Sequence, residues 1–460
     1  MEKHPNAYQA SYVYFIGLIA GLAGLLFGFD TGIISGAITF IQKEFELSNA
    51  MEGLIVSIVM IGAILGTVVS NFISRNFGRR DALVAAGALF TVCAIGSALA
   101  THTIFLISVR FFLGIAIGLA SYTAPLYLAE ISPRQVRGMI IAFYQLMIAA
   151  GLLASYISDL IFTPSGSWRW MLGIPAIPGI FLLLFSLKLP GSPRWLMLKN
   201  RPEETRRVLK RIFPPDQAEK EFNEIRTRVE VDRSTKPGWH ALFDKKFVSV
   251  LILGIGAQMM QQWTGCNIIL YYAPIIFKLA GFATPIQQMW GTIAVGTVMM
   301  VTTIIAVKYV DKWGRRPILF WGLAMMMFSL TVLGIATHFA AVSTAAQAIS
   351  VAFVLIYIFG FAISLGPIVW IICSEIFPIY SRDFGIMCTT AGNWIFNAML
   401  ASIFPSMISW LGSNAFFLFV GACILSFLFV YFFIPETKGV SLEQIETNLK
   451  AGKKLRHIGK

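Results

Sequence analysis

Asp30 is an acidic residue deep inside an apolar stretch, residues 12–36, with at least ten uncharged residues on either side. A carboxylate at the centre of a membrane costs at least ~2.5–3.5 kcal/mol unless it is paired, hydrated or protonated. Access to water, or to a cation that moves, can therefore switch whether such a group holds a proton. Asp30 is therefore a candidate functional residue. The alternative is a static structural ion pair.

A second group of side chains has the chemistry to bind a neutral polyol. Amides both donate and accept hydrogen bonds, and aromatic rings cover the apolar face of a sugar ring. Within the stretch 248–279, positions 263, 267 and 271 repeat every four residues and share one helical face. The residues of this kind are Gln145, Gln261, Gln262, Asn267, Tyr271, Trp370, Asn393, Trp394 and Asn397. The alternative for any single amide is a hydrogen bond between helices, worth ~0.6–2 kcal/mol.

Charged residues recur in short turns that combine an acid with arginines. Gly-Arg-Arg occurs at 78–80 and 314–316, and Glu-Ile-x-Pro with a following Arg occurs at 130–137 and 375–382. We expect ion pairs within each half, which form a cytoplasmic gate that breaks when a central cavity opens inward. The pairs are Glu130 with Arg79 or Arg80 and Glu375 with Arg315 or Arg316, and the gate also includes Arg137 and Arg382. The alternative is that these residues fix only topology and loop packing.

The composition places these residues in a membrane. Hydrophobic residues make up 57% of the 460 residues and charged residues only 13%, against about 25% charged residues in soluble proteins. Apolar runs of about 20 residues indicate membrane-spanning helices. Twelve such runs lie near 12–36, 53–74, 82–100, 104–129, 138–161, 170–189, 248–279, 287–310, 317–338, 345–372, 384–411 and 414–434. The fold class is therefore an all-α integral membrane protein.

The basic residues predict the orientation of the chain. If the N-terminus is cytoplasmic, every Lys and Arg falls on the cytoplasmic side except Lys43, Arg110, Arg169 and Lys278. This follows the positive-inside rule, so the net charge of +13 reflects topology and we expect no nucleic-acid partner. Both termini are predicted to be cytoplasmic. Minimal outer loops and the lack of an N-x-Ser/Thr sequon favour a bacterial cytoplasmic (inner) membrane.

The sequence contains no motif that indicates an enzyme. No Ser/His/Asp set, metal-ligand cluster or nucleotide-binding loop is present, and the five cysteines all lie in apolar runs. We expect no metal and no cofactor, with the proton as coupling ion. Asp159 also lies in an apolar run, but near the outer end of the fifth, where we expect it to be solvated and without a role.

Short motifs that recur in the two halves indicate an internal repeat. Glu130, Pro133 and Arg137 return 245 residues later, and Pro190 returns as Pro435 at the same offset. Two parallel six-helix bundles with a substrate path between them fit this pattern. The predicted organisation is an N-terminal bundle, a linker with short helices, a C-terminal bundle and a cytoplasmic tail. Their ranges are 1–190, 191–246, 247–434 and 435–460.

An ordered set of motifs resembles the sugar porters of the major facilitator superfamily from end to end, in particular the bacterial proton symporters of galactose, arabinose and xylose. The motifs are Gly28-Phe29-Asp30-Thr31-Gly32, Gly78-Arg79-Arg80, Arg137-Gly138, Gly191-Ser192-Pro193-Arg194, Gln261-Gln262-Trp263-Thr264-Gly265, Gly314-Arg315-Arg316, Ser374-Glu375-Ile376, Arg382-Asp383-Phe384-Gly385 and Pro435-Glu436-Thr437-Lys438-Gly439. The resemblance implies twelve helices in two six-helix bundles. It also implies import of a monosaccharide, a hexose such as galactose or glucose, with a proton by alternating access.

The same resemblance assigns roles to single residues. It pairs Asp30 with Arg110 for proton coupling, and passive glucose facilitators are similar but have Asn at the acid position. It assigns sugar binding to Gln145, Gln261, Gln262, Asn267, Trp370 and Asn393. It assigns packing or occlusion to Phe27, Tyr271 and Trp394, and a hinge to the Gly366-Pro367 pair, which is expected to interrupt the tenth run.

The sequence departs from the family pattern at three positions. Ser74 stands where the family has Asp before the first Gly-Arg-Arg, although the second copy keeps Asp311. Gly191 replaces the Glu of Pro-Glu-Ser-Pro-Arg, and Met299 replaces a sugar-binding Asn of the eighth span. The first two changes weaken the cytoplasmic ion-pair network. The third removes an amide from the sugar site.

Three other functions remain as alternatives to sugar–proton symport. Passive facilitation is opposed by Asp30 and Arg110, and a drug or metabolite antiporter is opposed by the amide cluster. A sugar sensor without transport would fit the same fold. The expected partners are a monosaccharide, a proton and membrane lipid, and we expect a monomer.

Overall fold

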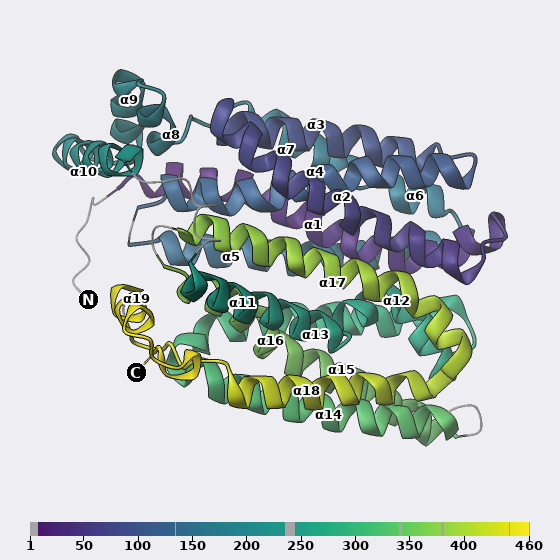
Figure 1. Cartoon of the computed structure of the whole chain (residues 1–460). Coiled ribbons are helices and arrows are strands. Elements are labelled where there is room, and N and C mark those ends of the chain that lie inside the picture. Colours follow the sequence, from purple (N-terminus) through teal and green to yellow (C-terminus); the bar gives the residue numbers. More distant parts are fainter. Residues whose placement is uncertain are drawn as a thin grey trace. The chain divides into compact units, whose positions relative to one another are not determined.

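The protein is described by a computed structural model over residues 8–133, 135–234, 244–339, 343–378, 381–440 and 442–459. Arg134 and the side chains of Asp311 and Asp383, which belong to the charged turns and motifs above, lie outside the described residues. The described residues form helices and short turns and contain no strand (Figure 1).

The helices fall into three successive groups along the chain. The first comprises α1 (Ala10–Glu44), α2 (Asn49–Asn76), α3 (Arg79–Ala98), α4 (Thr103–Ile131), α5 (Arg137–Phe162), the 3₁₀ helix η1 (Thr163–Ser165), α6 (Trp168–Gly173) and α7 (Ala176–Ser186). The second comprises α8 (Pro193–Leu198), α9 (Pro202–Ile212) and α10 (Pro215–Ser234). The third comprises α11 (Lys245–Trp263), α12 (Cys266–Leu279), α13 (Pro285–Trp313), α14 (Arg315–Phe339), α15 (Thr344–Ile363), α16 (Leu365–Glu375), α17 (Arg382–Leu411), η4 (Gly412–Asn414), α18 (Ala415–Phe432), α19 (Leu442–Lys450) and η5 (Leu455–His457).

Ten helical stretches among the described residues are long and apolar enough to cross a membrane. One of them, Phe384–Phe432, contains both α17 and α18 and corresponds to the eleventh and twelfth predicted spans. The seventh predicted span is divided between α11 and α12, so it does not appear as one continuous stretch. The helices therefore agree with the twelve spans predicted from hydropathy.

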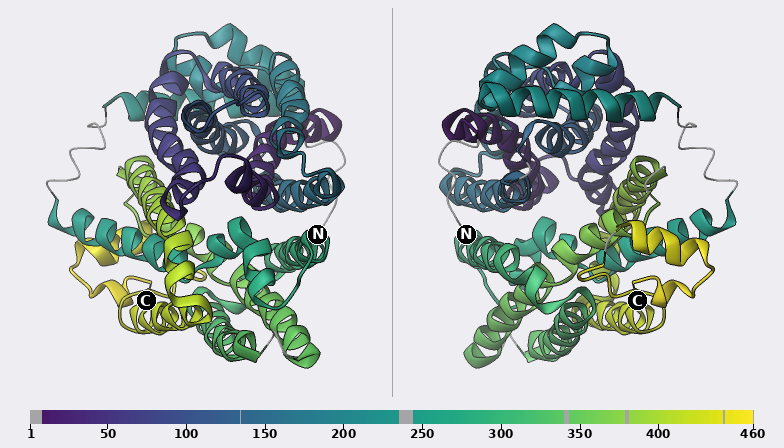
Figure 2. Two further views of the ribbon diagram at one scale, coloured as in Figure 1. Left: turned by 90° about the vertical axis from the view of Figure 1, so that its right-hand side faces the viewer. Right: turned by 90° about the vertical axis from the view of Figure 1, so that its left-hand side faces the viewer.

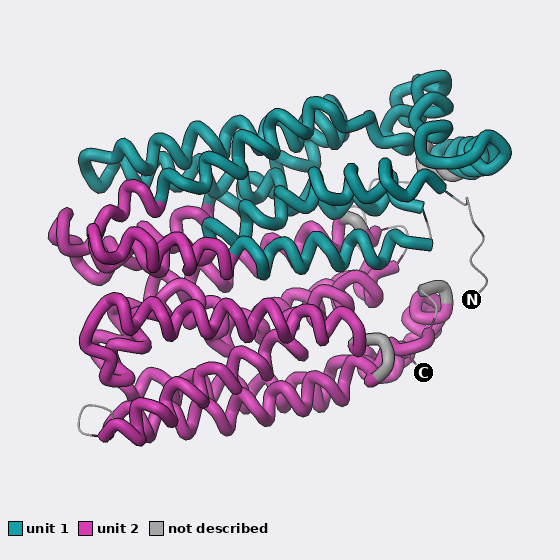
Figure 3. The backbone as a smooth tube through the Cα atoms, turned by 180° about the vertical axis from the view of Figure 1, so that it is seen from behind, with its two compact units in different colours: residues 1–30, 62–151, 172–236 teal, residues 31–61, 152–171, 237–460 magenta. Residues whose placement is uncertain are grey.

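The chain divides into two compact units (Figure 3). Unit 1 consists of residues 1–30, 62–151 and 172–236, and unit 2 of residues 31–61, 152–171 and 237–460. Within unit 1, α3 packs against α4 and α7, and α8 to α10 lie beyond one end of these helices (Figure 1). Within unit 2, α14 packs against α15 and α18, and α11 packs against α17. Figure 2 shows the helices of each unit end on.

Four glycines at every fourth position bring α1 and α5 into close contact. In unit 1, a Cβ at Gly28 would overlap the backbone carbonyl of Ile148, and Gly24 faces Tyr144 in the same way. In unit 2, Gly32 faces Ser155 and Gly36 faces the carboxyl of Asp159. Small residues let membrane helices approach to backbone contact. This packing holds the turn that carries Asp30.

Three predicted spans are interrupted in the structure. The sixth is divided between α6 and α7, which the sequence analysis did not anticipate although Pro175 lies at the break. The tenth is divided at Ser364, which has φ −118° and ψ −91°. The predicted interruption is therefore present, but it lies two residues before Gly366, which with Pro367 belongs to the first turn of α16.

The seventh span is interrupted at Thr264 and Gly265. Gly265 has a φ of 93°, a conformation that side chains with a Cβ rarely adopt. A Cβ at this position would lie 2.8 Å from the ring of Phe419. The Tyr357 hydroxyl donates a hydrogen bond to the Thr264 carbonyl at 2.7 Å, so this carbonyl has a partner at the break. Glycine is required here by both conformation and space.

We predict that Gly265→Ala lowers the free energy of unfolding by about 1 kcal/mol or more, because it strains the backbone and crowds Phe419. Thermal unfolding of the purified protein in detergent measures the change. Gly421→Ala in α18 is the matched control, since a Cβ there meets nothing within 4 Å. Equal melting temperatures for the two variants would contradict the account.

Candidate functional site

Asp30 lies beside Arg110 in unit 1. The Asp30 Oδ1 and the Arg110 Nη1 are 3.9 Å apart, and the two residues are 6% and 1% exposed. Asp30 is on α1 and Arg110 on α4, so the pair joins two membrane-spanning helices. A separation of 3.9 Å is longer than a hydrogen bond. The cation therefore offsets the charge of the carboxyl without locking it in one geometry.

The amides predicted to bind sugar form one connected chain of hydrogen bonds in unit 2. The Asn267 Nδ2 donates to the Gln262 Oε1 at 2.7 Å, and the Gln262 Nε2 donates to the Gln261 Oε1 at 3.3 Å. The Asn393 Nδ2 donates to the same Gln261 Oε1 at 2.7 Å. Gln261, Gln262 and Asn393 are buried, and Asn267 is half-buried. The chain links α11, α12 and α17 in a polar patch inside apolar helices.

Gln258 is a member of this chain that the sequence analysis missed. It is fully buried, its Oε1 accepts from the Asn393 Nδ2 at 2.6 Å, and its Nε2 faces the Cys373 Sγ at 3.6 Å. It lies three residues before Gln261 and four before Gln262, which are the spacings of neighbours on a helix face. The signal was therefore present as helical spacing, one turn before the Gln-Gln pair.

The chain of hydrogen-bonded amides also reaches the interruption of the tenth span. The Gln261 Nε2 donates to the carbonyl oxygens of Leu365 at 2.8 Å and Gly366 at 3.2 Å. These carbonyls belong to the first turn of α16, directly after the break at Ser364. One amide thus connects the sugar-binding candidates of α11 to the start of α16. If α16 moves, these hydrogen bonds must break or the Gln261 side chain must move with the helix.

The other predicted residues are found in three settings. Tyr271 and Trp394 are buried in unit 2, and the Tyr271 hydroxyl accepts from the Asn397 Nδ2 at 3.0 Å. Trp370 on α16 is 40% exposed. Phe27 on α1 and Gln145 on α5 belong to unit 1, where Phe27 is half-buried and Gln145 is exposed.

An ion pair holds the charged turns of unit 1. The Arg79 Nη2 is 2.8 Å from the Glu130 Oε1, and the Ser192 hydroxyl donates to the other oxygen of Glu130. Of the two expected partners of Glu130, the structure therefore selects Arg79. The Arg79 Nη1 also donates to the Ser74 carbonyl at 3.0 Å, while the Ser74 hydroxyl has no hydrogen-bond partner. Ser74 thus contributes its backbone where the family has a carboxylate.

The same arrangement recurs in unit 2. The Arg315 Nη2 is 2.9 Å from the Glu375 Oε1, and the Thr437 hydroxyl donates to the Glu375 Oε2 at 2.5 Å. The acids and the hydroxyls are each separated by the repeat offset of 245 and the arginines by 236, so arginine, acid and hydroxyl correspond between the two units. The repeat seen in the sequence is therefore also a repeat of geometry.

The remaining arginines of the charged turns have other partners. The Arg316 Nη1 donates to the Ile434 carbonyl at 2.5 Å and its Nη2 to the Tyr431 carbonyl at 3.2 Å. The Arg80 Nε lies 3.5 Å from the Asp81 Oδ1, and the Arg137 Nη2 donates to the Ser132 carbonyl at 3.2 Å. Arg382 begins α17 and is half-buried. Arg316 and Arg137 thus bind backbone carbonyls, and Arg80 pairs with the next residue along the chain.

Glu436 shows which helix-capping interaction is lost where Gly191 replaces a glutamate. Its two carboxylate oxygens accept the backbone N–H groups of Arg315 at 3.0 Å and Arg316 at 2.9 Å, which are the first residues of α14. A carboxylate at a helix N-terminus satisfies free donors and interacts favourably with the helix dipole. In unit 1, α3 begins without a side-chain cap. Gly191 occupies the position that corresponds to Glu436.

Known sugar transporters match the whole chain. Residues 16–449 match the family model for sugar (and other) transporters. The chain is 45% identical to the galactose-proton symporter of Escherichia coli over 99% of this chain and 98% of the relative, and 43% identical to the arabinose-proton symporter over 97% and 95%. The structure aligns with the proton:xylose symporter XylE bound to 6-bromo-6-deoxy-D-glucose with a TM-score of 0.79 and 31% identity, over 97% of this chain and 100% of that chain.

We predict that Gly191→Glu stabilises the protein by about 0.3–1 kcal/mol, because the new carboxylate caps the N-terminus of α3 as Glu436 caps α14. The nearest atoms to a Cβ at 191 belong to the flexible side chain of Leu196, at 3.2 Å. Thermal unfolding measures the gain. Glu436→Gly is the reverse variant and should lower the melting temperature. A loss of stability on adding the carboxylate would refute the correspondence.

Proposed function

This chain is a member of the sugar transporter family of the major facilitator superfamily, and from that premise we propose that it imports a monosaccharide together with a proton by alternating access. Membership gives the all-α fold of twelve transmembrane helices in two six-helix bundles, and a transporter rather than an enzyme. The observation that carries the proposal is the buried Asp30 carboxyl beside Arg110.

The proton step is proposed to occur on Asp30. With a proton bound, the carboxyl is neutral and loses its attraction to Arg110. Without it, the negative charge requires that cation or water. Alternating exposure of Asp30 to the two sides of the membrane therefore turns a proton gradient into a bias on the conformational cycle. A passive facilitator has no need for a buried acid at this position.

The sugar is proposed to bind at the amide chain of α11, α12 and α17. Asn267, Gln262, Gln261 and Asn393 donate to and accept from one another in this structure. Sugar hydroxyls both donate and accept, so they can replace these bonds in kind and leave no amide unpartnered. We propose that Trp370 covers the apolar face of the ring and that Gln145 is a further sugar-binding residue.

A hexose such as galactose or glucose is the proposed substrate. Support comes from the 45% identity with the galactose-proton symporter over almost the full length of both chains. Met299 on α13 is half-buried and presents a thioether where the family has an amide. We propose that a bound hexose therefore makes no side-chain hydrogen bond at this position.

The charged turns are proposed to act as a gate on the cytoplasmic side. Arg79 with Glu130 and Arg315 with Glu375 are paired within their own units, and a hydroxyl supports each acid. Opening a cavity at this side must rearrange the helices that the pairs join, so the pairs oppose opening. We propose that Arg80, Arg137, Arg316 and Arg382 support the turns, and that the break at Ser364 acts as a hinge for α16.

The proposed setting is the cytoplasmic membrane of a bacterium, with both termini in the cytoplasm. Support comes from the positive-inside bias of Lys and Arg. We further propose a monomer surrounded by lipid, with bundles at 1–190 and 247–434, a linker at 191–246, a tail at 435–460 and no nucleic-acid partner.

Asp30→Asn tests the proposed function directly. In liposomes, the wild-type protein should accumulate a hexose from a panel of monosaccharides only when a proton gradient is imposed. Asp30→Asn should lose accumulation entirely while sugar exchange between the two sides continues, because the amide keeps the shape but cannot carry a proton. Full accumulation by the variant would exclude Asp30 as the proton carrier.

Asn267→Ala and Gln145→Ala test the sugar site. Each should lose transport while the protein still inserts and folds, with affinity falling about tenfold or more for each lost hydrogen bond of roughly 1.5 kcal/mol. Sugar binding to purified protein, followed by tryptophan fluorescence, measures affinity. Gln217→Ala on the linker helix α10 is the control. Unchanged affinity in both site variants would overturn the assignment.

A further inference from the structure

Asp159 is buried, which corrects the expectation that it is solvated at the membrane interface. The residue is 0% exposed and lies on α5 within unit 2. Position near the end of a span does not determine exposure here. The close approach of α1, made possible by Gly36, covers the carboxyl instead. A fully buried acid in a membrane-spanning segment requires an explanation.

One carboxyl oxygen of Asp159 has a partner and the other has none. The Oδ2 accepts the backbone N–H of Gly36 at 3.0 Å. The Oδ1 has no hydrogen-bond partner. A Cβ at Gly36 would overlap the carboxyl, so the absence of a side chain lets the two helices seal this contact. The Thr163 hydroxyl binds the Asp159 backbone carbonyl at 2.7 Å and leaves the carboxyl untouched.

Among the described residues, no cation of the elements around Asp159 pairs with its carboxyl, and Lys278, in the last turn of α12, is exposed. On α1, residues 31–42 contain no ionisable side chain. On α5, Tyr156 lies one turn earlier and donates its hydroxyl to the Leu270 carbonyl of α12 at 2.8 Å. The ionisable side chains of α12 before Lys278 are Cys266, Tyr271 and Tyr272, whose ordinary pKa values lie above 7.

The cation that follows on α6 is engaged elsewhere, and the facing part of α13 offers none. Arg169 pairs with Glu44 at 2.7 Å. Residues 285–307 of α13, which include Gln288 at the recess described below, carry no charge. Within the described part of the chain, Asp159 forms no ion pair. Nothing here offsets a negative charge on its carboxyl.

We propose that Asp159 is a second proton-binding site, separate from Asp30, which holds its proton on Oδ1 while α5 packs against α1 as in this structure. A neutral carboxyl can be buried with one hydrogen bond, whereas an isolated carboxylate would shift its titration or draw in water. The Oδ2 still accepts from Gly36 in the protonated form. This proposal does not rest on sugar transport.

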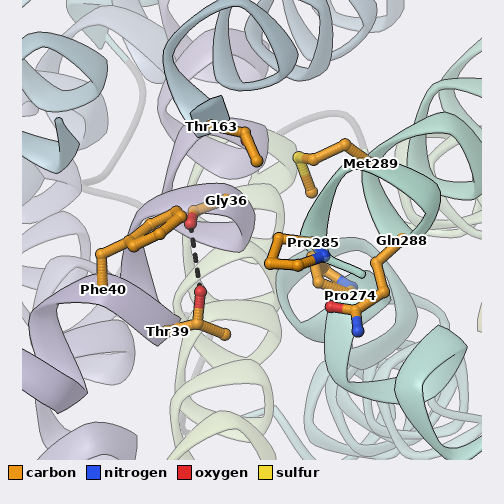
Figure 4. A pocket seen from close by; sticks show the side chains of 8 residues that line it. All are labelled: Gly36, Thr39, Phe40, Thr163, Pro274, Pro285, Gln288 and Met289. Carbon is orange, nitrogen blue, oxygen red and sulfur yellow. Dashed lines mark hydrogen bonds between the residues drawn. The ribbon is translucent and has the colours of Figure 1, made fainter. Parts of the chain in front are cut away.

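A small recess lies next to the hydrogen-bond partners of Asp159, and the proposed proton enters from it. Its lining includes Gly36 and Thr39 of α1, Thr163 of η1 and Gln288 of α13 (Figure 4). Two of these residues, Gly36 and Thr163, are the hydrogen-bond partners of Asp159. Water in the recess can donate the proton and take it back, with no other bond made or broken. Because a bare carboxylate disfavours this contact, proton loading stabilises the packing of α5 on α1.

Infrared difference spectroscopy of the purified protein in H₂O and D₂O tests the proposal. The wild type should show the C=O band of a protonated carboxyl that Asp159→Asn lacks and Asp30→Asn retains. The Asn side chain keeps an acceptor for the Gly36 N–H and should preserve the fold. If its yield is poor, Asp159→Ser provides a smaller uncharged acceptor, and the same band should be missing.

Glu52→Gln is the matched control. Glu52 on α2 is another buried acid of unit 2, 2% exposed, with an unpartnered Oε1. The Asp159 band should persist in this variant. Identical spectra for wild type and Asp159→Asn, or loss of the band only in Glu52→Gln, would overturn the proposal. Neither result depends on proton-coupled sugar uptake, so failure here is distinguishable from failure of the proposed function.

Discussion

Burial of charge in a medium that cannot solvate it is the constraint on which this structure depends. A membrane-spanning helix tolerates an acid only with a cation, water or a proton. Asp30 has Arg110 at 3.9 Å, close enough to offset its charge and too far to bond it firmly. We propose that this loose pair lets the carboxyl take up and release a proton. Sugar–proton coupling, as proposed, is a consequence of that freedom.

The same constraint accounts for the repeated turns at the ends of the helices. Arginine, acid and hydroxyl recur as Arg79, Glu130 and Ser192 in unit 1, and as Arg315, Glu375 and Thr437 in unit 2. Charges in these turns pair with one another, while the amide chain of α11, α12 and α17 offers neutral groups to a neutral substrate.

Sequence patterns predicted the elements and most of the polar residues, but not how deeply each lies. Hydropathy gave the spans, because length and apolarity alone determine them. Gln258 escaped notice because it stands one turn before the Gln-Gln pair, and its role depends on Asn393 from another helix. Asp159 was placed in solvent because exposure depends on the approach of α1 at Gly36, a contact 123 residues away in sequence. Tertiary proximity is the information that a single sequence lacks.

The most direct test is the movement of protons that accompanies sugar. Protein in liposomes, in a weakly buffered medium without an imposed gradient, is given a hexose while the external pH is recorded. The account predicts that sugar entry makes the medium more alkaline, and that Asp30→Asn abolishes this change while sugar still exchanges. Entry of sugar at the wild-type rate with no change in external pH would contradict it.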